Sequence, residues 1–257
     1  MPWNHDTYER FRQERLEPVY DLMKLIRVRP GLRVVDLGCG TGDITAMLAD
    51  TLPEATVLGI DDSPEMLRQA WPRRRDGLDF RLQRIQDVKG KWDLVFSNAA
   101  IQWVPDHQSL IPALLSLVNP GGQIVIQVPR GHPALGLIKE VAATERFRDA
   151  LTGSGRFDCL SLLSYAELLH QCGGKEIVAV EKIYPHVLQD ADEIFAWAEG
   201  TALVPYMDRL EGTLRQEFLD QYRRLLHDRW PAKPVLFGFQ RMLIAAAMPF
   251  ATVSGVG

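Results

Sequence analysis

One segment constrains the fold more than any other: Val34-Val35-Asp36-Leu37-Gly38-Cys39-Gly40-Thr41-Gly42-Asp43. An apolar run ends in an acidic residue, three alternate glycines follow, and a helical pattern begins directly after them. Glycine adopts positive φ angles at little cost, so the backbone can turn sharply here and approach a ligand closely. The first N–H groups of a helix lack intrahelical partners and attract an anionic group. The segment therefore predicts a nucleotide-type site that follows a β-strand.

The glycine spacing separates two classes of nucleotide site. A dinucleotide-binding fingerprint needs a third glycine three residues after the second, and that position is occupied by Asp43. An NAD-dependent oxidoreductase therefore remains only an alternative. The order D-x-G-x-G-x-G instead resembles motif I of class I S-adenosylmethionine (SAM) methyltransferases. This resemblance implies that Asp36 reaches the methionine amino end of SAM, and that Gly38, Gly40 and Gly42 admit its methionine portion. A non-catalytic SAM-binding protein would carry the same motif.

A second buried strand is predicted at residues 56–60, and it ends in Asp61 and Asp62. An acidic residue at this tip can accept hydrogen bonds from both ribose hydroxyls. Ser63-Pro64-Glu65 is typical of a helix start, with a capping serine and a proline in the first turn. The resemblance to methyltransferases implies that Met66 lies against the adenine ring, and the alternative is an ordinary core methionine. We therefore predict Asp61, Asp62 and Met66 as cofactor-binding residues.

The ends of the third and fourth strands add further candidates. Strand predictions at residues 78–82 and 94–97 place the following loops at the edge of the sheet where ligands bind in open α/β folds. Asn98 is predicted to contact the cofactor, and Gln102 and Trp103 the substrate. The resemblance to methyltransferases implies an acidic residue after the third strand that binds adenine, and Asp87 fills this position only through a register shift. Without that shift Arg84 occupies the position.

Strands alternate with helices along the first half of the chain, which is typical of a parallel sheet. The fifth strand is expected at residues 123–128, after the turn at residues 119–122, with helices at 43–52, 64–71 and 108–118. We predict an α/β fold, a doubly wound and mostly parallel sheet with an α-helical C-terminal cap. The expected domains are an N-terminal helical lid (1–30), a SAM-binding core (31–130), and the cap with closing strands (131–250). Helices are expected near 165–171, 192–202 and 212–229 and a strand at 176–184, and the run at 237–247 is either an edge strand or a buried helix.

Composition narrows the possible partners. With 33 acidic and 29 basic residues the formal net charge is −4, so no electrostatic footprint for nucleic acid is present. The sequence shows neither a long apolar stretch nor a secretory signal pattern, so no membrane association is expected and a cytoplasmic location is favoured. The three cysteines lack metal-ligand spacing, so no metal site is expected. A monomer or a weak homodimer is expected.

Several motifs together resemble the trans-aconitate 2-methyltransferase family over nearly the whole chain. They are Trp3-Asn4 with Tyr8, Phe11, Arg15 and Pro18, the glycine motif, residues 97–107, Trp197 with Gly200-Thr201, and Phe237 with Arg241-Met242-Leu243-Ile244-Ala245. The family implies methyl transfer from SAM to a carboxylate of a small tricarboxylic acid. A carboxylate is ionised at neutral pH, so orientation suffices and no catalytic base is predicted.

The same resemblance directs attention to groups that could hold the other carboxylates of the acceptor. Arg241 is a cation inside an apolar run, which is costly to bury without a partner, and arginine pairs with carboxylates through two hydrogen bonds. Tyr206 is a further predicted substrate ligand. The family pattern has an arginine shortly before this tyrosine, where the present chain has Val204 and Pro205. A methyltransferase for another small-molecule or carrier-bound acid is therefore the closest alternative.

Overall fold

The computed structural model describes residues 12–154, 159–200 and 202–250. Trp3, Tyr8 and Phe11, which we expected in the N-terminal lid, lie outside the described residues. The chain forms two compact units. Of the described residues, 18–129, 159–182 and 241–250 form the sheet unit, and 12–17, 130–154, 183–200 and 202–240 form the helical unit. Both are assembled from interleaved segments, whereas the sequence suggested three consecutive ranges.

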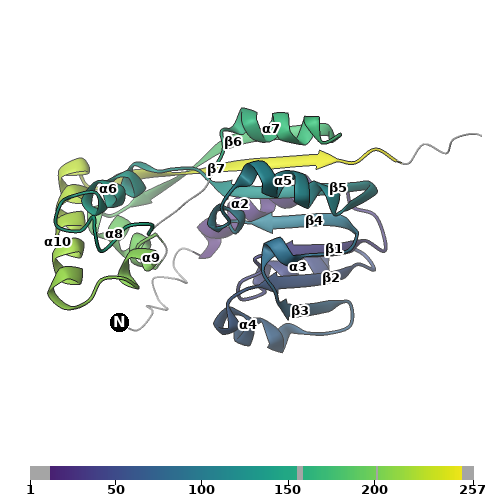
Figure 1. The fold of residues 1–257 in the computed structure, drawn as a ribbon, viewed down its shortest axis with the longest axis horizontal. Helices are drawn as coiled ribbons and strands as arrows, with labels where there is room; N and C mark the ends of the chain where they lie inside the picture. Colours follow the sequence, from purple (N-terminus) through teal and green to yellow (C-terminus); the bar gives the residue numbers. More distant parts are fainter. Residues whose placement is uncertain (1–11, 155–158, 201, 251–257) are drawn as a thin grey trace, which may run out of the picture. The chain divides into compact units, whose positions relative to one another are not determined.

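A seven-stranded sheet has the order β3-β2-β1-β4-β5-β7-β6 (Figure 1). Its strands are β1 (Arg33–Leu37), β2 (Thr56–Asp61), β3 (Leu78–Leu82), β4 (Trp92–Asn98), β5 (Val118–Pro129), β6 (Lys175–Leu188) and β7 (Val235–Ala247). The pairs β1–β2, β1–β4, β2–β3 and β4–β5 are parallel, and β5–β7 is antiparallel. The predicted mostly parallel, doubly wound sheet is thereby confirmed.

The first five strands occur where the sequence predicted them, but β2 and β4 extend slightly beyond their predicted ranges and β5 begins well before its own. β5 begins at Val118 and includes the predicted turn, which is accommodated as an irregularity in the β4–β5 ladder. Gly121 within it has a backbone φ angle of 73°, which residues other than glycine rarely adopt. The turn predicted at residues 119–122 is therefore present, but it lies within a strand and not before one.

The run at 237–247 was predicted as an edge strand or a buried helix; it is a strand, β7, but its predicted position at the edge is wrong. It is an interior strand between β5 and β6, and β6 forms the edge of the sheet. Met242, Ile244 and Ala246 are buried on one face, while Leu243 and Ala245 are buried on the other. An apolar run that is covered on both faces needs pairing on both sides, which an interior position provides.

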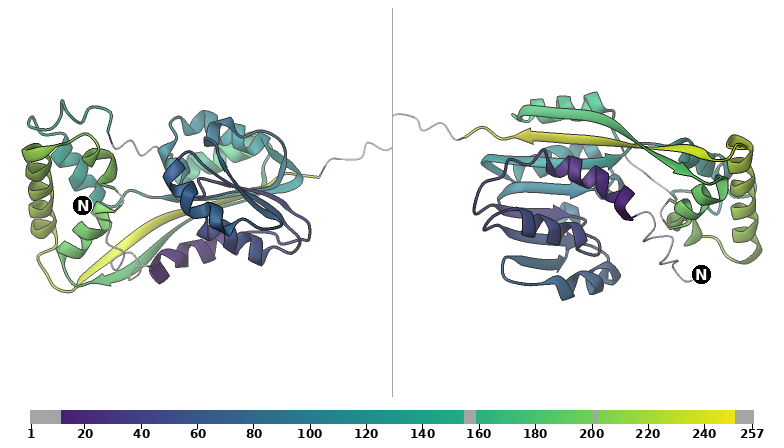
Figure 2. Two further views of the ribbon diagram at one scale, coloured as in Figure 1. Left: turned by 90° about the horizontal axis from the view of Figure 1, so that it is seen from below. Right: turned by 180° about the vertical axis from the view of Figure 1, so that it is seen from behind.

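Helices cover both faces of the sheet unit (Figures 1 and 2). One face of the sheet, which we call the α3 face, packs against α2 (Arg12–Met23), α3 (Asp43–Thr51) and α4 (Pro64–Ala70). Leu22, Leu48 and Leu67 are fully buried on this face. The opposite face, which we call the α5 face, packs against α5 (His107–Ser116) and α7 (Leu162–Gln171), and Leu114 and Leu169 are buried there. Two separate apolar cores therefore hold the strands in place, and the carboxyl ends of β1, β2 and β4 carry the predicted site.

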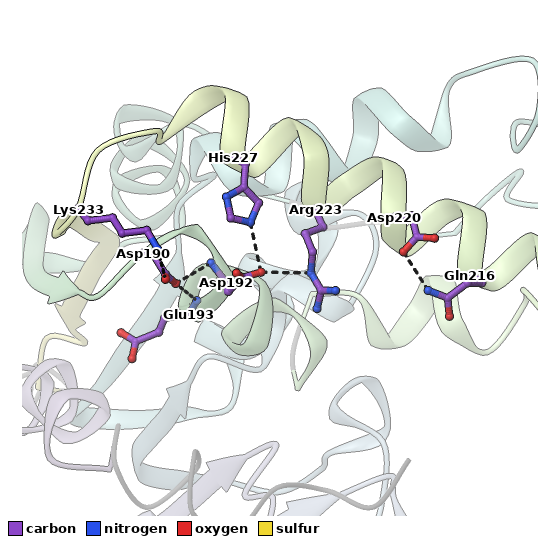
Figure 3. A network of polar contacts seen from close by, with 8 residues as sticks. All are labelled: Asp190, Asp192, Glu193, Gln216, Asp220, Arg223, His227 and Lys233. Atoms are coloured by element: carbon purple, nitrogen blue, oxygen red, sulfur yellow. Dashed lines mark hydrogen bonds and ion pairs between the residues drawn. The ribbon is translucent and has the colours of Figure 1, made fainter.

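The helical unit is built from α6 (Pro133–Ala142), α8 (Ala191–Glu199), α9 (Val204–Met207) and α10 (Gly212–Arg229), with the adjoining ends of β6 and β7. Asp190 caps α8 by accepting the backbone N–H groups of Asp192 and Glu193, and it also pairs with Lys233 (Figure 3). Asp192 in turn pairs with Arg223 and His227 of α10. In the described part of the chain, no helix is long and apolar enough to cross a membrane.

Candidate active site

The glycine loop connects β1 to α3, and its three glycines have different roles. Gly38, Gly40 and Gly42 all have positive φ angles, of 73°, 55° and 79°. A Cβ atom on Gly38 would lie 2.3 Å from the Cβ of Ala100, and one on Gly42 would lie 2.7 Å from the ring of Phe80. A Cβ on Gly40 would meet no atom within 4 Å. Gly38 and Gly42 are therefore needed for packing, whereas the backbone at Gly40 borders open space that a ligand can enter.

Asp61 at the end of β2 fastens this loop. One carboxylate oxygen accepts the backbone N–H of Gly40 at 2.8 Å, and the other accepts that of Ser63 at 2.9 Å. Each oxygen retains further acceptor capacity, so ribose hydroxyls could bind without displacing the loop. The side chain of Asp62, next in the sequence, is exposed. The sequence anticipated a ligand at Asp61 but not its hydrogen bond to the glycine loop.

Asp36 is a buried carboxyl group at the carboxyl end of β1. Its side chain accepts a hydrogen bond from the Thr45 hydroxyl of α3 at 2.7 Å. Burial raises the pKa of Asp36 to about 7, the bond from Thr45 opposes that rise, and the negative charge of Asp61 adds to it. A cation bound nearby would favour ionisation of Asp36, which suits the amino group that we predicted as its partner.

Two predicted adenine contacts lie on short segments after β2 and β3. Met66 lies in the first turn of α4 and is 42% exposed, so it is not a core methionine. Asp87 lies in the short 3₁₀ helix η2 (Ile85–Asp87), with an exposed side chain 3.8 Å from that of Arg84. Both residues of the register ambiguity thus occupy one exposed turn. Gln83 precedes this turn and bridges it, because its side-chain amide donates to the carbonyl of Asp87 at the end of the turn.

Asn98 ends β4, and Gln102 and Trp103 follow in the 3₁₀ helix η3 (Ile101–Trp103). The side-chain oxygens of Asn98 and Gln102 are buried and accept no hydrogen bond. The Gln102 amide nitrogen donates to the Ala99 carbonyl at 2.6 Å, which orients the oxygen away from that carbonyl. Trp103 is 48% exposed. Buried polar atoms normally have partners, so the two oxygens mark places where a ligand donor fits.

His107 holds η3 in place from the first turn of α5. One ring nitrogen contacts the Ile101 carbonyl at 2.8 Å, and the other contacts the Tyr165 hydroxyl of α7. The ring is almost completely buried. Both nitrogens are therefore engaged in structural contacts, and His107 positions the loop that carries Gln102.

The remaining predicted substrate ligands lie in different units. Arg241 belongs to the sheet unit, on β7 opposite Pro129 of β5. Tyr206 belongs to the core of the helical unit, where its ring stacks on Phe218 and burial raises the pKa of its hydroxyl.

Sequence reasoning overlooked Gln127 on β5, whose buried side-chain nitrogen has no hydrogen-bond partner. The available signal was one amide inside the apolar run at residues 124–128.

Comparisons with known proteins show the family and the fold of the chain. The family model described as a methyltransferase domain matches residues 29–190. A trans-aconitate 2-methyltransferase from Deinococcus radiodurans is 42% identical and covers 97% of this chain and 99% of its own length. The enzymes of that name from Variovorax paradoxus and Escherichia coli K12 are 36% and 32% identical, with 96% and 95% of this chain covered and 98% and 97% of their own lengths.

Solved structures share the fold at low identity. The YcgJ protein from Bacillus subtilis aligns with a TM-score of 0.62 and 11% identity, over 91% of this chain and 98% of its own. The phosphoethanolamine N-methyltransferase 2 of Haemonchus contortus, solved with S-adenosyl-L-methionine, aligns with a TM-score of 0.56 and 17% identity. That alignment covers 91% of this chain and 52% of the Haemonchus contortus protein, so the chain spans about half of that protein.

Proposed function

Because the chain belongs to the trans-aconitate 2-methyltransferase family of class I methyltransferases, we propose that it transfers a methyl group from SAM to a small polycarboxylic acid such as trans-aconitate. The product is a monomethyl ester. The observation that carries this proposal is the extent of the similarity. Identity of 42% extends over 97% of the chain, so it includes the helical unit as well as the glycine loop.

The residues at the carboxyl ends of the strands fit a SAM molecule. The space at Gly40 and the unpaired oxygen of Asn98 support a ligand with donor groups beside the glycine loop. In this proposal Asp36, Gly38, Gly40, Gly42 and Asn98 hold the methionine portion. Asp61 and Asp62 hold the ribose, and Met66 and Asp87 hold the adenine. Bound SAM supplies a methyl carbon that is electrophilic because it is attached to a sulfonium.

The protein's contribution is to position the acceptor and to exclude water. A carboxylate acceptor is ionised at neutral pH, so no residue needs to remove a proton. The engagement of both His107 nitrogens is consistent with this. Gln102 and Trp103 border the acceptor from η3, Arg241 pairs with a carboxylate from β7, and Tyr206 is a further proposed substrate ligand. The enzyme acts in the cytoplasm. It is a monomer or a weak homodimer, and sedimentation at several concentrations would test this association state.

A labelled-methyl assay tests the proposal. Purified protein is incubated with SAM carrying a radiolabelled methyl group and with trans-aconitate, other small di- and tricarboxylates, or a malonyl group on a carrier protein. We expect label in a base-labile methyl ester with trans-aconitate. Labelling of the carrier-bound acid alone would favour the alternative acceptor class. No methyl transfer to any acid, together with SAM binding by calorimetry, would indicate a non-catalytic SAM-binding protein.

A further inference from the structure

Gln127 is a buried polar residue on the α3 face of the sheet, near the carboxyl end of β5. Its side chain is 1% exposed, and its amide nitrogen has no hydrogen-bond partner. Its neighbours on that face, Val125 of the same strand and Leu243 of β7, are apolar and buried. An aliphatic residue at this position would leave no polar atom unpaired, so the glutamine is not explained by packing.

Gln123, four residues earlier on the same face of β5, shows what a structural glutamine does here. Its side-chain oxygen accepts the backbone N–H of Arg27 at 2.6 Å, and its nitrogen donates to the Leu25 carbonyl at 2.9 Å. Both ends of its amide are therefore used, and they fasten the segment after α2. Gln123 lies toward the amino end of the parallel strands and Gln127 toward the carboxyl end, where α/β sheets bind their ligands.

The position of Gln127 relates it to two predicted ligands. It pairs in register with Asn98 of β4, and its backbone carbonyl accepts the N–H of Ala99. On its other side Leu243 is its register partner, and side chains two residues apart on a strand share a face. Arg241 is therefore a diagonal neighbour of Gln127 on the α3 face, within reach of a long side chain.

We propose that Gln127 is a specificity-determining residue, whose amide nitrogen donates a hydrogen bond to a carboxylate of the acceptor other than the one being methylated. This inference rests on the proposed function. Arg241 supplies the positive charge for that carboxylate, and Gln127 supplies a neutral donor at a fixed place. A donor matches an acid, because ionised carboxylates only accept hydrogen bonds. The residue thereby favours polycarboxylates over monocarboxylates.

The test compares Gln127→Met with Gln123→Met in the full-length protein. Methionine keeps the length of the side chain and removes the amide. For Gln127→Met we expect the ratio of kcat/KM for a dicarboxylate to that for a monocarboxylate to fall about tenfold. The acceptor KM should carry most of this change. SAM affinity by calorimetry and the thermal midpoint should stay at the wild-type values. Gln123→Met should lower the thermal midpoint and leave the acceptor ratio unchanged.

Two results would overturn the inference. One is an unchanged acceptor ratio in Gln127→Met, and the other is a loss of thermal stability as large as that of Gln123→Met. The proposed function is tested separately by the wild-type protein. If the wild type methylates no acid, calorimetric titration of di- and monocarboxylates into wild type and Gln127→Met in the presence of S-adenosylhomocysteine still decides whether Gln127 reads a carboxylate.

Discussion

Gly38→Ala tests whether the glycine loop is fixed by packing against the loop after β4. The positive φ of Gly38 costs an alanine about 1–2 kcal/mol. The new Cβ would lie 2.3 Å from the Cβ of Ala100 and 3.6 Å from its Cα, and overpacking of a core costs about 1–3 kcal/mol more. We therefore expect a loss of about 2–5 kcal/mol in the free energy of unfolding, measured by calorimetry or urea denaturation.

The double variant Gly38→Ala with Ala100→Gly separates the two contributions. Removing the Cβ of Ala100 relieves the close contact, so about half of the lost stability should return, while the cost of positive φ persists. Gly40→Ala is the matched control, because it has positive φ but open space around it. It should cost only about 1–2 kcal/mol and should weaken SAM binding. If Gly38→Ala were as stable as Gly40→Ala, or if Ala100→Gly restored nothing, the packing argument would fail.

Three further perturbations test other parts of the site. Burial raises the pKa of Asp36 from 3.8 to about 7, so its contribution to stability is complete below pH 3.8 and is lost as pH rises to about 7. The loss is about 1 kcal/mol per pH unit, and urea denaturation between about pH 5 and 6.5 should show a flatter profile for Asp36→Asn. Asp61→Ala removes both loop hydrogen bonds and should weaken SAM binding at least tenfold; unchanged affinity by calorimetry would remove Asp61 from the site. His107→Leu removes the contact of the imidazole with the Ile101 carbonyl and its contact with the Tyr165 hydroxyl. It should cost about 1–3 kcal/mol of stability and lower kcat, with a pH profile of the same shape as wild type; loss of one limb of that profile would instead indicate a catalytic base.

The strands were predictable where local pattern and fold agree. β3 occurs at the predicted residues, because its alternation of buried Leu78 and Phe80 with exposed Asp79 and Arg81 suits a strand with one covered face. The run that became β7 was ambiguous, because a continuous apolar stretch fits a strand and a buried helix equally well. Its placement between β5 and β6 depends on pairing between segments far apart in the chain, which periodicity does not contain.

The glycine motif could be predicted from the sequence, but the different role of each of its glycines could not. Three glycines at alternate positions look equivalent in the sequence. In the structure a Cβ atom on Gly38 would clash with Ala100 in the loop after β4, whereas Gly40 borders open space. Likewise Gln123 and Gln127 are both single amides in an apolar strand. Only the tertiary partners of Gln123 distinguish the two.

The interior position of the last strand affects how the protein is synthesised. Until residues 235–247 leave the ribosome, β5 has no partner on its outer side, and β6 has no place in the sheet. A nascent or truncated chain would therefore leave backbone N–H and C=O groups along one side of β5 without partners, which invites association with other chains. Premature termination before β7 should give an insoluble product, and not a smaller folded protein.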